Sequence, residues 1–456
     1  MTQLHVIDLV IVAFYLSICV ILGFKGFGKI KTLREYALGN KPITTSVLTA
    51  TVFATAISSS KVIGHIGKSY SMGVMFIFSI FFVSLGWLIM SKLLYKNANF
   101  FFRKKFLTMS DIMEYWYGNS AGMLTSIGAV FVSLGAVAIG NMAMGKLIHY
   151  FFGIPELWGI IISLCILTFY STLGGFNAVA FTDVFQFLIF FVALPLAFSV
   201  GYNDAGGYKS ILKALPKSHL TIEYKDIPLF FSMIAFALMP NADIPYIHRA
   251  LSARTRYQVK KAFSSVAILM LPFLGMVAFI GLITYVKEPN LQENTVAFYF
   301  MKSYLPSGVL GIMIAGLFAI IMSSQDSFLN SASVLISNNI FKRIWPDLSP
   351  RKELIVARSA TVVIPVLSIG MVFIKKSITE TVWFVSNFWE PLIVVPFLAA
   401  LIGVRINKKM FLIIPSVTLL SQLIAVQIVG ALDTRSCAVG IVTAAITTFA
   451  VSAIRK

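Results

Sequence analysis

Serine hydroxyls crowd an otherwise apolar stretch at residues 320–333, which reads IIMSSQDSFLNSAS. Ser323 and Ser327 are four positions apart and Ser324 is three positions from Ser327, so these hydroxyls share one face of a helix. Hard cations such as Na⁺ take oxygen ligands, as Ca²⁺ and Mg²⁺ do. Hydrogen bonds between helices explain a few such serines, but not so many at once. The stretch therefore predicts a helix face that helps to bind a cation.

A second stretch, residues 46–73, is long and apolar enough to cross a membrane, but its middle is polar. There it carries small polar residues, a lysine and two glycines: Thr55, Ser58, Ser59, Ser60, Lys61, Gly64 and Gly67. In hydrocarbon, each unsatisfied backbone group costs several kcal/mol, so such a segment must line a hydrated, protein-enclosed cavity. Broken helices of this kind hold ions and substrates near the bilayer midplane. The alternative is an unbroken helix whose small residues pack on its neighbours.

Residues 228–250 form another interrupted segment, because Pro240 and Pro245 flank Asn241 and Asp243. Proline removes a backbone donor and clashes with the preceding helical turn, so we expect this helix to break inside the membrane. Counted from the second apolar span, the interrupted segments are the first and the sixth. That placement is typical of two inverted halves of five helices each. An ordinary proline kink is the alternative.

Five ionisable residues fall within or at the ends of apolar spans: Lys61, Asp183, Asp243, Asp326 and Glu390. An ionisable side chain at mid-membrane costs about 2.5–3.5 kcal/mol on insertion scales, so each indicates a function by default. The alternative is structural, since Lys61 and one acid could neutralise each other merely to hold helices together.

The elements that must position these residues are membrane helices. The chain is 58% hydrophobic and 12% charged, whereas a soluble domain carries about 25% charged residues. A membrane helix needs about 20 apolar residues. On that basis we expect about thirteen spans, near residues 5–24, 46–71, 75–96, 124–147, 155–173, 178–200, 228–247, 263–285, 308–338, 355–374, 381–403, 410–430 and 435–454. Cys19, Cys165 and Cys437 lie in or beside these spans without metal-ligand spacing, so we expect buried free thiols.

The net charge of +19 comes from basic residues in short connections between spans. They gather at residues 25–41, 92–105, 249–261, 342–358, 405–409 and 455–456. With an odd number of spans these connections share one side, which the positive-inside rule makes cytoplasmic. We therefore expect the N-terminus outside and the C-terminus inside. The same placement weakens a nucleic-acid interpretation. The chain has no phosphate-binding glycine loop, no GxSxG elbow and no paired carboxylates of a soluble domain, so an enzyme or an ATP-driven pump has no support.

Four stretches in order carry a resemblance to a known family: TMSDIMEYWYG (108–118), STLGGFNAVAFTDVFQ (171–186), RALSARTRYQVKKA (249–262) and SSQDSFLNSAS (323–333). They resemble the sodium:solute symporters, which include proline, pantothenate, sugar and sialic-acid symporters. The resemblance runs from Tyr36 to about Gly403. It implies a single all-α membrane domain of the LeuT-like fold: a leading helix (5–24), two inverted five-helix repeats (42–200 and 226–404) and two trailing helices (408–454).

The resemblance also implies site residues. The family's main sodium site maps onto the carbonyl groups of Ala54 and Ile57, together with Ile320, Ser323 and Ser324. A second sodium site, present in some members, maps onto Asp183 with Ser323 and Ser327. Asp326 stands at one of its serine positions, which puts that site in doubt. Substrate contacts map onto Lys61, Ser58, Asp243 and Tyr246, and a lysine there implies a solute with a carboxylate.

From these patterns we expect a sodium-driven symporter that imports a small organic solute, such as proline or another organic acid, as a monomer in the inner (plasma) membrane. Na⁺ is the expected coupling ion. A proton-coupled or uncoupled carrier of the same fold is the first alternative, with Asp183 or Asp326 titrating. A membrane sensor that does not transport is the second.

Overall fold

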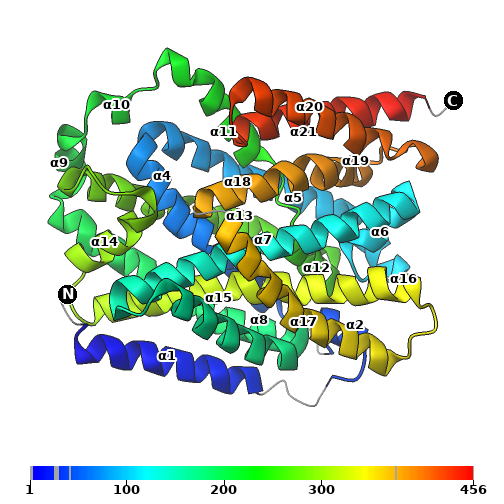
Figure 1. Ribbon diagram of the computed structural model, residues 1–456, viewed down its shortest axis with the longest axis horizontal. Coiled ribbons are helices and arrows are strands. Elements are labelled where there is room, and N and C mark those ends of the chain that lie inside the picture. Colours follow the sequence, from blue (N-terminus) through cyan, green and yellow to red (C-terminus); the bar gives the residue numbers. More distant parts are fainter. Residues whose placement is uncertain (1–3, 25–29, 41–42, 375–376, 455–456) are drawn as a thin grey trace.

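The computed structural model describes residues 4–24, 30–40, 43–374 and 377–454. Five of the basic residues that the orientation prediction places in the cytoplasm lie outside the described residues: Lys25, Lys29, Lys41, Arg455 and Lys456. Across the described part of the chain the elements are all helices, and the long ones run roughly side by side along one axis (Figure 1).

The first half of the chain supplies a leading helix and the helices around the first break. Their bounds are α1 (Val6–Phe24), α3 (Thr45–Ala56), the π-helical turn η1 (Ser60–Gly64), α4 (His65–Met72), α5 (Val74–Lys104), α7 (Asn119–Phe152) and α8 (Glu156–Asp204). The second half supplies α11 (Ile227–Leu238), α12 (Ile244–Ser252), α13 (Arg256–Lys287), α15 (Val309–Leu335), η4 (Ile336–Phe341), α17 (Pro350–Ile374), α18 (Ile378–Trp389), η5 (Glu390–Val394), α19 (Val395–Ile402), α20 (Ile413–Val429) and α21 (Thr434–Ala453).

Shorter helices occupy the connections. They are α2 (Leu33–Leu38), α6 (Met109–Tyr117), α9 (Gly207–Ala214), α10 (Lys217–Leu220), η2 (Tyr224–Asp226), η3 (Glu293–Thr295), α14 (Val296–Tyr304), α16 (Lys342–Ile344) and η6 (Lys408–Met410). The N-terminus, α4, α9, α10 and α14 lie at one end of the long axis, and α2, α6, α16 and the C-terminus lie at the other (Figure 1).

Among the described residues, nine helices are long and apolar enough to cross a membrane, or ten if the bent pair 45–56 and 60–72 counts as one span. The sequence predicts about thirteen. The three further predicted spans are α1, the first part of α8, and α11 with α12, which are short or interrupted. Two predicted spans merge in α8, where Gly175 adopts φ 55° and ψ −168° and bends the helix.

Both predicted breaks are present. Helix α3 ends at Ala56, Ile57 is extended (φ −87°, ψ 93°), and the chain resumes at a bend of 58°. Helix α11 ends at Leu238 and α12 begins at Ile244, with Pro245 in its first turn. The freed carbonyls of α11 lie against Gly86 of α5, where an added Cβ would lie 2.7 Å from the Met239 carbonyl oxygen. A glycine is therefore required at this close approach.

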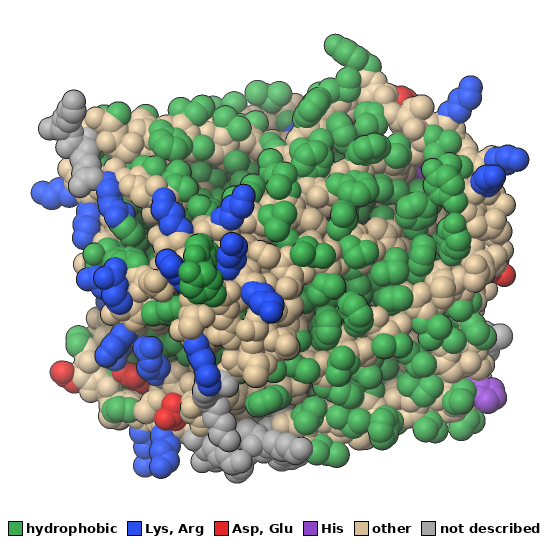
Figure 2. Space-filling model, turned by 180° about the vertical axis from the view of Figure 1, so that it is seen from behind, with side chains coloured by type: hydrophobic (Ala, Val, Ile, Leu, Met, Phe, Trp, Pro, Cys, Tyr) green, Lys and Arg blue, Asp and Glu red, His purple; other side chains and the backbone are tan. Residues whose placement is uncertain are grey.

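The outer surface carries a broad band of apolar side chains, as a lipid-facing surface does (Figure 2). Lys and Arg side chains gather at the end that holds the C-terminus. Two of the three cysteines, Cys19 and Cys437, are buried free thiols as expected, but Cys165 is exposed on the outer face of α8, so the expectation of a buried thiol was wrong there.

Candidate functional site

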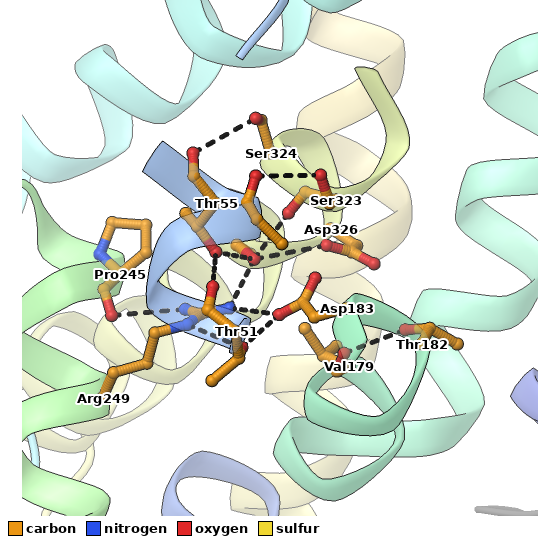
Figure 3. A network of polar contacts seen from close by, with 12 residues as sticks. Thr51, Thr55, Val179, Thr182, Asp183, Pro245, Arg249, Ser323, Ser324 and Asp326 are labelled. Carbon is orange, nitrogen blue, oxygen red and sulfur yellow. Dashed lines mark hydrogen bonds and ion pairs between the residues drawn. The ribbon is translucent and has the colours of Figure 1, made fainter. Parts of the chain in front are cut away.

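Six oxygen atoms converge where the broken end of α3 meets α15. Figure 3 labels Thr55, Ser323 and Ser324 among the residues that supply them. Ser323 Oγ lies 3.1 Å from the Ala54 carbonyl oxygen and 3.2 Å from that of Ile320. Ser324 Oγ lies 3.2 Å from the carbonyl oxygens of Thr55 and Ile320, and 3.5 Å from that of Ile57. We call this group the oxygen cluster: Ala54, Thr55, Ile57, Ile320, Ser323 and Ser324.

The local chain explains why these oxygens are available. The last four carbonyl groups of a helix have no partner within it, and the C-terminal end carries a partial negative charge. The break after Ala56 exposes such an end in the interior of the protein, and α15 brings two hydroxyls to it. The donor set consists of neutral oxygens, which fits a hard monovalent cation such as Na⁺. All five predicted residues of the main site lie together here, and Thr55 adds a carbonyl oxygen that sequence reasoning missed.

A different arrangement surrounds Asp183 of α8. The Arg249 Nη2 atom of α12 lies 2.8 Å from Asp183 Oδ2 and 2.6 Å from Ser327 Oγ, and Arg249 Nε lies 2.9 Å from Thr51 Oγ1. Thr51 also donates a hydrogen bond to Asp183. The Asp183 side chain is 0% exposed and that of Arg249 is 2% exposed. We call these four residues the ion-pair cluster: Thr51, Asp183, Arg249 and Ser327.

This pair bears on two predictions. Arg249 does not belong to a basic connection at the membrane surface, because its guanidinium is buried in the core. The residues predicted for a second sodium site lie in or beside this cluster. One oxygen of Asp183, Oδ2, is paired with Arg249, and Ser327 is bonded to the same guanidinium, whereas Asp183 Oδ1 is buried without a hydrogen-bond partner among the described residues. The other two predicted members are Ser323, which belongs to the oxygen cluster, and Asp326, which is buried with its Oδ1 atom 3.3 Å from Ser327 Oγ.

The predicted substrate contacts meet at one cavity of about 250 Å³ beside the oxygen cluster. Lys61, Ser58, Asp243 and Tyr246 all line it. They come from the two helix breaks, with Lys61 in η1 and Asp243 just before α12. Thr55 and Ser324 line the cavity as well, so two residues connect the cavity with the oxygen cluster. The structure thus brings together two pairs of residues, Ser58 with Lys61 and Asp243 with Tyr246, and the pairs are nearly two hundred positions apart in sequence.

Sequence reasoning missed several residues of the cavity wall, above all Trp383 and Trp389 of α18. It also missed the buried position of Arg249 in the ion-pair cluster. A signal for Arg249 exists in the chain. A carboxylate at mid-membrane needs a cation, and Arg249 is the basic residue nearest to the second break. The tryptophans gave no such signal, because an aromatic residue in a span is equally typical of packing against other helices.

The chain is similar in sequence to several sodium-coupled transporters. It is 26% identical over 408 residues to the sodium/glucose cotransporter of Vibrio parahaemolyticus, covering 79% of this chain and 73% of that protein. It is 23% identical over 401 residues to sodium/proline symporter 2 of Staphylococcus saprophyticus (83% and 78%). It is 24% identical over 400 residues to the sodium/sialic acid symporter SiaT of Proteus mirabilis (82% and 79%).

The fold is similar to that of a Na⁺-coupled sialic acid symporter in a substrate-bound, outward-open state, with a TM-score of 0.84 over 99% of this chain and 98% of that one at 19% identity. It is therefore LeuT-like, as the sequence resemblance implied. The family match extends over residues 36–414, from α2 to the start of α20. The chain belongs to the sodium:solute symporter family, a family of sodium-coupled membrane transporters.

Proposed function

We propose that this protein is a sodium-coupled symporter that imports a small, carboxylate-bearing organic solute across the inner (plasma) membrane as a monomer. The observation that carries the proposal is the oxygen cluster, in which a broken helix end and two serine hydroxyls face one another beside a cavity lined by Lys61. Na⁺ binds at Ala54, Ile57, Ile320, Ser323 and Ser324, and the solute binds at Lys61, Ser58, Asp243 and Tyr246.

Coupling follows from where the ion binds. A Na⁺ held by the end of α3 and by α15 holds these two helices together in one conformation. An ion shifts a conformational equilibrium only by its differential affinity for the two states, so Na⁺ must bind the solute-receiving state more tightly. Because Ser324 belongs to both the oxygen cluster and the cavity wall, Na⁺ there also fixes one wall of the solute site.

The distribution of charge supports an orientation with the N-terminus outside. The basic side chains gather at the end that holds α2, α6, α16 and the C-terminus (Figures 1 and 2). The positive-inside rule places that end in the cytoplasm. Lys68 and Thr379, which lie toward the opposite end, line the cavity, and this supports the entry of solute from outside. A C-terminal reporter that is active only in the cytoplasm tests the orientation, and an inactive reporter on an inserted protein contradicts it.

The test of sodium coupling is uptake into proteoliposomes by the double variant Ser323→Ala/Ser324→Ala. A hydrogen bond to a charged group contributes about 1.5–3 kcal/mol. Loss of one such contact therefore raises the KM for Na⁺ by about 10-fold to 150-fold, and loss of both abolishes sodium-stimulated uptake. Ser333→Ala is the matched control, because Ser333 is buried in the same helix, donates a hydrogen bond to the Asn330 carbonyl and is not a member of the oxygen cluster.

Other outcomes of this uptake assay would contradict either the assigned ion site or sodium coupling itself. Sodium-stimulated uptake that persists in the double variant contradicts the assigned ion site. Uptake driven equally well by a proton gradient contradicts sodium coupling, and the absence of any gradient effect would favour an uncoupled carrier.

The Lys61→Gln variant tests the solute class in the same vesicles. If Lys61 binds the carboxylate, carboxylate solutes lose more affinity than neutral solutes. An equal loss for both would make Lys61 a structural residue.

A further inference from the structure

One wall of the cavity is formed by a charged residue that the proposed function leaves unused, Glu390. It opens η5, a π-helical turn that continues α18 and has Pro391 as its next residue. Single π-helical turns within helices are frequent at functional sites. Glu390 lines the same cavity as Lys61 and Asp243.

One oxygen atom of the Glu390 carboxylate, Oε2, is buried and makes no hydrogen bond to any residue that the structure describes. Ion pairs among the described residues do not include Glu390, Asp243 or Lys61. A buried charge is costly unless it is paired, and a charge inside a membrane protein usually marks a ligand or ion path.

The balance of charge in the cavity favours a cationic ligand group. Lys61 interacts electrostatically with both Asp243 and Glu390, so a single ammonium stands against two carboxylates. Lys68 adds no free charge, because its Nζ lies 3.0 Å from Glu293 Oε2. With both carboxylates ionised, the cavity would carry one negative charge more than Lys61 offsets, and a cationic ligand group is what would hold both acids in that form.

Aromatic side chains provide the second favourable feature. Phe76, Trp383 and Trp389 line the cavity, and the Trp383 ring already has the Lys68 Nζ atom 5.0 Å from its centre. An ammonium group over an aromatic ring gains about 0.5–1 kcal/mol at an exposed site and about 2 kcal/mol where water is excluded. Lys61 shows the same preference within the protein, since its Nζ lies 5.9 Å from the centre of the Trp87 ring.

We propose that Glu390 is the counter-charge for a protonated amino group of the transported solute. This inference rests on the proposed function and narrows its solute from an organic acid to a zwitterion of amino-acid size. Lys61 then meets the carboxylate of the solute, and Glu390 meets its amine. A plain carboxylic acid satisfies Lys61 but leaves Glu390 unpaired.

The test measures binding to the purified full-length protein by thermal stability, with and without Na⁺. The probes are an equimolar pool of the common L-amino acids and a matched pool of the corresponding 2-hydroxy acids, in which a neutral hydroxyl replaces the amine. A third pool contains the corresponding decarboxylated amines. We expect the amino acids to bind at least 10-fold more tightly than the hydroxy acids, and the amines to bind with intermediate affinity.

The variant Glu390→Gln should lower the affinity for the amino-acid pool at least 10-fold and leave the stabilisation by Na⁺ alone unchanged. Glu380→Gln is the matched control, because Glu380 is an exposed glutamate of α18 that does not line the cavity. The comparison of pools on the unaltered protein does not depend on whether the variant folds.

Equal affinity for amino and hydroxy acids overturns the inference, as does an unaltered affinity in Glu390→Gln or the absence of binding by all three pools. These results are distinguishable from a failure of the proposed function. That failure appears as a protein which Na⁺ does not stabilise, or whose stabilisation by Na⁺ survives in Ser323→Ala/Ser324→Ala.

Discussion

Two polar clusters lie side by side in the core and use the same helices in opposite ways (Figure 3). The oxygen cluster joins the end of α3 to α15 with neutral oxygens only. The ion-pair cluster lies one to two turns earlier on α3, where α8 and α12 add a carboxylate and a guanidinium. One cluster offers ligands to a cation, and the other contains its own cation.

The difference shows what a membrane interior requires of a cation site. A permanent carboxylate in the core needs a permanent counter-charge, and arginine supplies one because it stays protonated. Carbonyl and hydroxyl groups are better ligands for an exchangeable ion, because they leave no unpaired charge in the core when the ion dissociates. Ser327 connects the clusters, because its hydroxyl contacts both Arg249 and Thr55.

The largest expected effect comes from breaking the ion pair with Arg249→Met. Removal of one partner leaves the buried Asp183 charge uncompensated, which costs about 3–5 kcal/mol of folding stability. Thermal denaturation of the purified protein should therefore show a large loss. The double variant Arg249→Met/Asp183→Leu is the matched control and should recover most of the loss, because no unpaired charge remains. A single variant as stable as the unaltered protein would contradict the interpretation of this cluster.

The comparison also predicts the number of ions carried. Because Arg249 occupies the carboxylate of Asp183, we expect one Na⁺ per solute, measured as a reversal potential or as a Hill coefficient of about 1 in uptake. In Arg249→Gln the carboxylate of Asp183 becomes available to a second cation, and the coefficient should rise above 1. Two ions per solute in the unaltered protein would show that the pair opens to admit an ion.

A smaller effect is expected from Thr51→Val, which removes hydrogen bonds to both charges of the pair but leaves the oxygen cluster intact. We expect a loss of about 1.5–3 kcal/mol in stability, with the KM for Na⁺ within about twofold of normal. Thr125→Val is the matched control, since the Thr125 hydroxyl is buried without a hydrogen-bond partner among the described residues. A large rise in the KM for Na⁺ would mean that the clusters act as one site.

The residues of the oxygen cluster could be predicted because their pattern is local. A helix break and a run of serines are visible in sequence, and the family resemblance identified which carbonyl and hydroxyl groups meet. The ion pair could not be predicted in the same way. Asp183 and Arg249 come from separate helices, and Arg249 is followed directly by a basic connection, so its charge was assigned to the membrane surface. Only the three-dimensional packing distinguishes it from its basic neighbours.

The residues that line the cavity could also be predicted only in part from the sequence. Lys61 and Asp243 lie at visible helix breaks, so their approach to each other followed from the inverted arrangement of two halves. Glu390 and Trp389 lie where α18 changes to a π-helical turn. In the sequence, only Pro391 indicates that turn. Which wall of the cavity carries the second carboxylate therefore became clear only from the fold.

The smallest expected effect belongs to Ser327, the residue that connects the two clusters. Ser327→Ala removes the contacts of its hydroxyl with Arg249 (2.6 Å) and Thr55 (2.9 Å) but no proposed ligand of the main ion site. Arg249 keeps Asp183 and Thr51, so we expect a loss of about 1 kcal/mol in stability and a rise of about two- to threefold in the KM for Na⁺. Ser333→Ala on the same helix should change neither value by as much. If Ser327→Ala instead abolished sodium-stimulated uptake, the ion would have to be held at Ser327, and the division between a filled and an exchangeable cation site would fail.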